Sequence, residues 1–337
     1  MKVLFIGGTG LISSVCSELA MQCGMDLTIL NRTISKKHPV PAGAHLLVAD
    51  VHGELGPLES LLHGQRFDAV VDWIAFTPDD IQRDLKLFKG RTGQFMFISS
   101  ASAYRKPVGH YLITEETPLE NPFWQYSRDK IACEQLLMRE YHDTSFPVTI
   151  IRPTLTYGVS QIPLAVGSWT HPYTVIDRMR RGQPVIVPGD GTSLWVTTWN
   201  GDFAKGLVGL LGRSDALGEA FHITSDEALT WDQLYIQAAR AAGVKPHIVH
   251  IASDLISAYD PEMFGSLTGD KINSVVFDNS KIKRFVPDFV CEVPWAEGTR
   301  RAMAWFDADA SRRTIDEPAN RLWDTILANY QRAFPQQ

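Results

Sequence analysis

KVLFIGGTGLISSVCSELAMQCG, residues 2–24, is the stretch that determines the fold. Its apolar run from Val3 to Ile6 predicts a buried parallel strand. A glycine-rich turn follows directly. Apolar side chains then recur at the spacing of a helix that packs on a sheet, at Val15, Leu19, Ala20 and Cys23. Gly24 stands where such a helix should end, so the chain is predicted to open with a strand, a tight turn and a helix.

The turn between this strand and helix is a candidate pyrophosphate site. The N–H groups at the start of a helix and the positive end of its dipole attract anions. Gly7 would permit the tight turn and Gly10 would let the backbone approach the phosphates, while Ser13 occupies the third position of the glycine pattern. A purely structural turn is the alternative, because a lone glycine pattern is weak evidence. Its placement between a strand and a helix favours a dinucleotide site.

The composition limits the class of protein. The chain has 337 residues, 45% of them hydrophobic, which supports a large folded core. Its 38 acidic and 32 basic residues give a net charge of −6, which offers no general attraction for nucleic acid or an anionic membrane. The four cysteines form no CxxC pair, so we expect reduced thiols and no metal site. The short N-terminal apolar run and the lack of a membrane-length stretch predict a soluble, cytoplasmic protein.

Apolar strand-like runs alternate with helical runs along the first half of the chain. We expect strands at 27–30, 46–49, 69–74, 95–98 and 148–151, and helices at 81–88 and 130–141. This alternation predicts an α/β fold with a doubly wound parallel sheet. We expect a dinucleotide-binding domain over residues 1–158, to which 192–230 return, and a smaller substrate lobe made of 159–191 and 231–337. In that lobe we expect a mobile loop at 261–269 and a helix at 318–334.

Asn31 and Arg32 follow the second predicted strand, where a residue faces the adenosine ribose of a bound dinucleotide. An acidic residue there would bind the 2′-hydroxyl and repel a 2′-phosphate. The neutral Asn31 and the guanidinium of Arg32 favour NADP, although a solvated turn arginine explains the pattern equally well. Asp50 closes the third strand, where it could accept a hydrogen bond from the adenine amino group or cap a turn.

Candidate chemistry is carried by FMFISSASAY, residues 95–104, and YSRDK, residues 126–130. Tyr126 and Lys130 are four residues apart, so on a helix they share one face. A lysine beside the phenol, with a nicotinamide cation nearby, would lower the tyrosine pKa and create a general acid or base. Ser100 follows the fifth strand at the carboxyl edge of the sheet, where its hydroxyl can hold a substrate oxygen. The Tyr-x-x-x-Lys spacing alone is common and often belongs to surface residues. Its place after a strand that ends in Ser-Ser favours a catalytic pair.

The motifs GGTGLIS, Asp50, FISSASAY, YSRDK and IIRPTLTYG, in this order, resemble the extended short-chain dehydrogenase/reductase superfamily of NAD(P)-dependent epimerases, dehydratases and reductases. The resemblance is specific from residue 2 to about 158 and looser beyond. It implies a catalytic Ser100, Tyr126 and Lys130, with Lys130 also binding the nicotinamide ribose, and a homodimer. The expected cofactor contacts are Gly7, Thr9, Gly10, Leu11, Ile12, Asn31, Arg32, Asp50, Val51, Ala75, Phe76, Ser99, Tyr126, Lys130, Pro153 and Thr154.

Departures from the superfamily pattern disfavour some of the activities found in the superfamily. Ala101 and Ser102 stand where the sugar-nucleotide 4,6-dehydratases carry an Asp-Glu pair, so that dehydration route is disfavoured. Leu155 stands where many nucleotide-sugar enzymes carry an asparagine, and an apolar side chain cannot replace that donor.

We therefore expect an oxidoreductase that acts on a hydroxyl or carbonyl carbon of a sugar or sugar-nucleotide-like small molecule. The alternatives are an NADPH-dependent carbonyl reductase of a non-nucleotide substrate and a non-catalytic cofactor-sensing or RNA-binding protein. The second alternative arises because the sequence also resembles the branch of plastid stem-loop RNA-binding proteins. Nucleic acid is disfavoured by the acidic net charge.

Overall fold

A seven-stranded parallel sheet forms the centre of the larger part of the protein. The computed structural model describes residues 1–33 and 38–334. The strands are β1 (Lys2–Ile6), β2 (Asp26–Asn31), β3 (His45–Val48), β4 (Ala69–Asp72), β5 (Phe95–Ile98), β7 (Val148–Pro153) and β11 (Ala220–Ile223). Their order is β11-β7-β5-β4-β1-β2-β3, with every neighbouring pair parallel. The predicted doubly wound α/β fold is confirmed.

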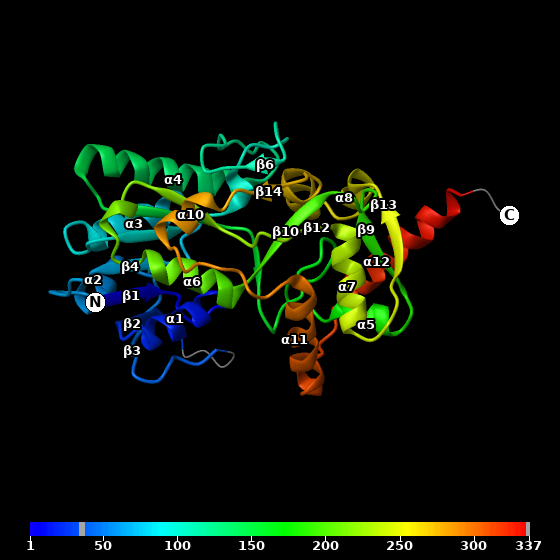
Figure 1. Ribbon diagram of the computed structural model, residues 1–337, viewed down its shortest axis with the longest axis horizontal. Helices are drawn as coiled ribbons and strands as arrows, with labels where there is room; N and C mark the ends of the chain where they lie inside the picture. The colour runs from blue at the N-terminus through cyan, green and yellow to red at the C-terminus, as the bar shows by residue number, and fades with distance from the viewer. Residues whose placement is uncertain (34–37, 335–337) are drawn as a thin grey trace.

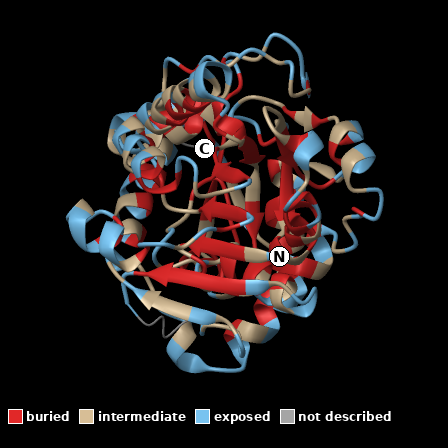
Figure 2. Cartoon of the chain, turned by 90° about the vertical axis from the view of Figure 1, so that its left-hand side faces the viewer, coloured by how far each residue is buried: buried red, intermediate tan, exposed pale blue. Residues whose placement is uncertain are grey.

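Helices cover both faces of this sheet, and the alternation of side chains along β1 shows how. Val3 and Phe5 pack with residues of α1 (Ser13–Gln22) and α6 (Asn200–Leu210). Leu4 and Ile6 point the other way, toward a cluster with residues of α2 (Leu55–Leu61), α3 (Pro78–Phe88) and α4 (Gln125–Thr144). Figure 2 shows the inner strands buried between these layers, while the edge strand β3 is only partly buried. Burial on both faces is why the strands read as continuous apolar runs.

A smaller lobe lies to the right of the sheet in Figure 1. Its short strands are β6 (Leu112–Ile113), β8 (Leu155–Tyr157), β9 (Pro184–Pro188), β10 (Leu194–Trp199), β12 (Ala228–Thr230), β13 (His247–Ile251) and β14 (Val276–Phe277). Its helices are α5 (Thr174–Arg180), α7 (Trp231–Ala241), α8 (Ser253–Tyr259), α9 (Met263–Ser266), α11 (Trp295–Asp307) and α12 (Glu317–Arg332), while α10 (Ser280–Phe285) contacts β11. The short helical turns are η1 (Ala101–Ala103), η2 (Ser214–Ala216), η3 (Leu267–Lys271) and η4 (Ala310–Arg312). Within the described residues, no helix is both long and apolar enough to cross a bilayer.

Two local predictions are wrong. The strand expected to run to Ile74 ends at Asp72, because the Asp72 carboxylate accepts hydrogen bonds from the backbone N–H groups of Ile74 and Ala75 and turns the chain. The loop expected at 261–269 is helical, since it contains α9 and the start of η3. Gly265 in that segment lies so close to Trp124 that an added methyl group would collide with the indole. The glycine there permits this close packing.

Candidate active site

Two cavities lie at the carboxyl edge of the sheet and gather many of the predicted site residues. The first, of about 380 Å³, is lined by the predicted contacts Gly7, Thr9, Asn31, Arg32, Asp50, Val51 and Phe76, together with neighbours such as His52 and Ile74. The second, of about 240 Å³, lies against the smaller lobe and is lined by Ser100, Tyr126, Pro153 and Thr154. We call them the cofactor cleft and the inner cavity.

The glycine-rich turn at the cofactor cleft depends on backbone shape. Gly7 has a φ of +86°, which side-chain-bearing residues rarely adopt, and an added methyl group would lie 2.7 Å from the Ile74 side chain. Ser13, the departure from the glycine pattern, ties the turn together. Its hydroxyl donates to the Gly7 carbonyl at 2.6 Å and accepts from the Gly10 N–H at 2.8 Å. The turn is therefore held in place before any ligand arrives.

Asn31, Arg32 and Asp50 lie together in the same cleft. The Asn31 amide is buried and donates to the Thr9 hydroxyl at 2.8 Å, whereas Arg32 is exposed. Asp50 accepts a hydrogen bond from the His52 N–H at 3.0 Å, so it caps a turn, one of the two roles considered for it. Six predicted contacts lie outside the lining of either cavity: Gly10, Leu11 and Ile12 in the turn before α1, together with Ala75, Ser99 and Lys130.

Ser100 and Tyr126 meet in the inner cavity. Both side chains line it, the Ser100 hydroxyl acts to lower the pKa of Tyr126, and this hydroxyl lies 2.9 Å from that of Ser102. Ser127 of α4 in turn donates to Ser102 at 2.8 Å, so a line of hydroxyls leads from α4 to Ser100, which lines the inner cavity with Tyr126. Sequence reasoning noticed Ser102 only as a missing acidic residue. Its role as a link depends on a contact between η1 and α4 that no local pattern reveals.

Lys130 is buried between the two cavities. Its ammonium donates to the backbone carbonyls of Ala75 at 2.7 Å and Ile98 at 2.8 Å and lies 5.8 Å from the centre of the Tyr126 ring. Burial lowers the pKa of Lys130 to about 8. Burial also raises the pKa of Tyr126, although the Ser100 hydroxyl acts the other way. In the protein alone, loss of water disfavours the phenolate more than its neighbours stabilise it; the predicted lowering of the tyrosine pKa also requires a nicotinamide cation nearby and stays a prediction.

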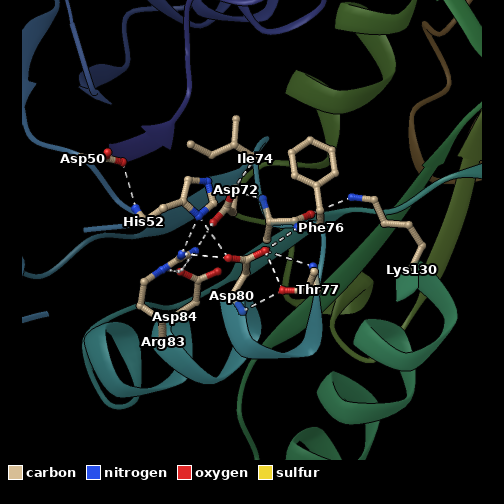
Figure 3. Close-up of polar contacts among 11 residues, drawn as sticks. Asp50, His52, Asp72, Ile74, Phe76, Thr77, Asp80, Arg83, Asp84 and Lys130 are labelled. Carbon is tan, nitrogen blue, oxygen red and sulfur yellow. Dashed lines mark hydrogen bonds and ion pairs between the residues drawn. The ribbon is translucent and has the colours of Figure 1, made fainter. Parts of the chain in front are cut away.

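The loop after β4 positions Lys130 through its backbone, as Figure 3 shows. Asp72 accepts from Ile74 N–H at 2.7 Å and Ala75 N–H at 2.9 Å, and the Ala75 carbonyl then receives Lys130. Asp80 accepts from the N–H groups of Phe76 and Thr77, at 2.9 and 3.0 Å. Ala75 thus reaches the site through its backbone, and the Phe76 ring lies 4.6 Å from the Lys130 ammonium.

Arg83 joins the carboxylates of this loop. It contacts Asp80 at 3.0 Å, Asp84 at 3.2 Å and Asp72 at 3.7 Å. Burial, together with the neighbouring Asp72 carboxylate, raises the pKa of Asp84 well above its usual range. One oxygen each of Asp72 and Asp84 is buried without a hydrogen bond from another described residue, and a proton shared between these carboxyls would satisfy both.

Ser99 does not join the site. Its hydroxyl donates to Glu134, which also forms a buried ion pair with Arg152 at 2.6 Å. Arg152 contacts the Tyr104 hydroxyl at 3.2 Å, and Tyr104 lies 3.1 Å from His222. This network links α4 with the strands β7 and β11 beneath the inner cavity. The prediction identified Ser99 by its place beside Ser100 and could not show that its side chain points away.

The comparisons with known proteins identify the family of this chain and proteins that share its fold. The model of the NAD dependent epimerase/dehydratase family matches residues 3–224. The chloroplast stem-loop binding protein of 41 kDa b from Arabidopsis thaliana is 26% identical over 280 residues, which cover 78% of this chain and 67% of that protein.

Solved structures show the same fold at low identity. UDP-glucose 4-epimerase from Thermotoga maritima, solved with UDP-glucose, is 16% identical with a TM-score of 0.72, covering 91% of this chain and 99% of that one. dTDP-glucose 4,6-dehydratase from Bacillus anthracis, solved with NAD, is 16% identical with a TM-score of 0.71, covering 92% of this chain and 98% of that one. On the extent of the family match, the chain belongs to the NAD dependent epimerase/dehydratase family.

Proposed function

We propose that the protein is an NAD(P)-dependent oxidoreductase of the epimerase or reductase type, acting on a hydroxyl or carbonyl carbon of a sugar or sugar-nucleotide-like substrate. One observation carries this proposal: Ser100 and Tyr126 line one cavity, and the buried Lys130 ammonium lies 5.8 Å from the centre of the Tyr126 ring and 4.6 Å from that of Phe76, which lines the cofactor cleft. The sugar substrate is supported by the solved relative with UDP-glucose.

The cofactor cleft fits a dinucleotide. The turn at Gly7 leaves space that a methyl group would fill, and the start of α1 directs backbone N–H groups toward a pyrophosphate. Asn31, Arg32 and Asp50 would hold the adenosine end, and Pro153 and Thr154 would lie beside the nicotinamide. When bound, this group supplies a hydride acceptor or donor.

The chain's own residues would move and hold the proton. Tyr126 would take a proton from the substrate hydroxyl or return one to its carbonyl. Ser100 would fix the same oxygen, with its own hydroxyl held by Ser102. Lys130 would place a positive charge near the phenol and bind the nicotinamide ribose. Its charge would favour the phenolate, which burial otherwise opposes.

Tyr126→Phe is the direct test. Removing the phenol should lower turnover by a factor of about 10² or more, because general acid–base catalysis typically contributes at least that much. UDP-glucose and UDP-galactose epimerisation and NADPH-dependent carbonyl reduction should both be assayed. Tyr141→Phe, the same change farther along α4, is the matched control and should keep full turnover. Equal turnover in the Tyr126→Phe and Tyr141→Phe proteins would contradict the assignment.

Cofactor retention separates the two reaction types. An epimerase returns the hydride to its substrate and keeps its cofactor, whereas a reductase exchanges cofactor in each cycle. We expect Arg32 to favour NADP, in which case exchangeable NADPH would indicate a reductase. Tightly held NAD in the purified protein would indicate an epimerase and would contradict the role given to Arg32.

A binding role without catalysis has one observation in its favour, the similarity to a stem-loop binding protein. The net charge of −6 weighs against it, because nucleic-acid affinity comes largely from basic groups that neutralise phosphates. Measuring RNA affinity over a range of salt concentrations would test it. Tight binding that weakens linearly in log–log form would support this alternative.

A further inference from the structure

Three charged side chains from distant parts of the sequence form one wall of the inner cavity. Lys106 follows η1, while Asp270 and Lys271 belong to η3. The two lysines are only 3% and 4% exposed, although both line the cavity that contains Ser100 and Tyr126. Groups so well buried are charged only where a partner offsets the loss of water.

The charges in this wall are unequal in number. The Lys106 ammonium has the Asp270 carboxylate at 3.8 Å, too far for a hydrogen bond. The Lys271 ammonium reaches the Ser266 carbonyl at 3.5 Å and lies 5.8 Å from the centre of a Trp124 ring. Burial lowers the pKa of both lysines and raises that of Asp270. The single carboxylate of Asp270 thus has to balance the charge of two ammonium groups, and neither ammonium group forms a close ion pair with it.

We propose that Lys106 and Lys271 form an anion subsite and that the substrate carries a carboxylate or phosphate group on the ring on which Tyr126 acts. This inference rests on the proposed function, because the proposed function is what places the reacting ring beside Tyr126. An anionic group bound there would balance the second ammonium and accept charge-assisted hydrogen bonds from both lysines.

The neighbouring outer cavity explains why the anion should be on the ring. This space, of about 570 Å³, is lined by Trp124, Trp169 and Lys271, which also line the inner cavity. Its remaining lining includes the three carboxylates of Asp260, Glu262 and Asp316. These would repel a nucleoside diphosphate placed in the outer cavity. Trp169 is 60% exposed at the junction and offers a flat face on which a sugar ring can stack.

Three ligands with one ring test the subsite. Glucose, glucuronate and glucose 6-phosphate differ only at C6, and their affinities can be measured by calorimetry on protein saturated with the reduced form of its tighter-binding cofactor. We expect glucuronate, glucose 6-phosphate or both to bind at least about tenfold more tightly than glucose, as charge-assisted hydrogen bonds require. The two anionic ligands distinguish a carboxylate from a phosphate.

Lys106→Met and Lys271→Met should each reduce this preference by about tenfold and leave cofactor affinity unchanged, because neither lysine lines the cofactor cleft. Lys245→Met, at an exposed lysine, is the control. Lys271→Met should also raise the melting temperature of the ligand-free protein by removing an incompletely paired buried charge. A lysine with a purely structural role would instead lower it.

Equal affinity for glucose and both anions, or no measurable binding of either anion, would overturn the inference. So would lysine-dependent binding of UDP-glucose without lysine-dependent binding of the two small anions, since the diphosphate would then be the recognised group. Failure of the proposed function gives a different result. In that case the anion preference persists, while the Tyr126→Phe and wild-type proteins show the same turnover.

Discussion

Arg32 is the residue that most directly reports cofactor choice. It is exposed at the cofactor cleft, beside the buried Asn31 that is tied to Thr9. Because Asn31 is already hydrogen-bonded to Thr9, we expect the exposed Arg32 to be the group that meets a 2′-phosphate. Arg32→Ala should weaken NADP binding by about tenfold or more and leave NAD binding nearly unchanged. Dissociation constants for both cofactors measure this; equal weakening would show that Arg32 does not discriminate.

His222 makes stability depend on pH. It lies between the Tyr104 hydroxyl at 3.1 Å and the Asp278 carbonyl at 2.7 Å, and burial lowers its pKa from 6.5 to about 4. As the pH falls, His222 therefore becomes protonated near pH 6.5 in the unfolded chain but only near pH 4 in the folded chain. The stability linked to neutral His222 is present above pH 6.5 and is lost as the pH falls through about 4, an effect of about 3 kcal/mol.

His222→Gln should remove this part of the pH dependence. Urea unfolding between pH 6.5 and about 4 should show a smaller loss of free energy in the variant than in the wild-type protein. His63→Gln, at an exposed histidine, should keep the wild-type slope. Parallel curves for wild-type and His222→Gln proteins would contradict the assignment.

At the scale of elements, the loop between β4 and α3 connects acidic side chains to the position of Lys130. Asp72→Ala would leave the backbone N–H groups of Ile74 and Ala75 without their hydrogen-bond acceptor. This change should lower the free energy of unfolding by about 2 kcal/mol or more. The freed loop should also weaken NAD(P) binding, because Phe76 lines the cofactor cleft. Urea unfolding and cofactor titration measure the two effects.

Asp68→Ala provides the matched control. Asp68 directly precedes β4 and accepts from the Lys2 N–H at 2.6 Å, far along the strand from the cleft. This variant should lose some stability but keep its cofactor affinity. A similar loss of affinity in both variants would mean that Asp72 acts through general stability alone.

The elements also show what sequence can predict. The strands β1, β2 and β5 were predicted because burial on both faces requires continuous apolar runs. The end of β4 was missed because it depends on an aspartate side chain that bonds its own backbone two and three residues on. In the candidate site, Ser100 and Tyr126 could be predicted from local sequence motifs. Lys106 and Lys271 could not, because only the tertiary structure brings them to the same cavity.

At the scale of the whole molecule, the parallel sheet depends on a late segment. Strand β11 pairs with β7, and α6 packs against α1. We therefore propose that α6 and β11, which lie within the predicted segment 192–230, belong with residues 1–158 in one domain. A fragment of residues 1–158 should not fold, because it exposes the β7 edge and the apolar face of α1. Circular dichroism and size-exclusion chromatography would detect the missing fold of this fragment. A compact, monomeric fragment would contradict the prediction.

The position of β11 also matters while the chain is being synthesised. A ribosome first releases the glycine turn, the loop after β4 and the helix that bears Tyr126, then residues 159–191 of the other lobe, and only afterwards Ala220–Ile223. During that interval β7 is an open edge, available to any other extended chain. Pausing of translation between β7 and β11 would thus lengthen the period in which the nascent protein is most prone to aggregate, and chaperone binding should concentrate there.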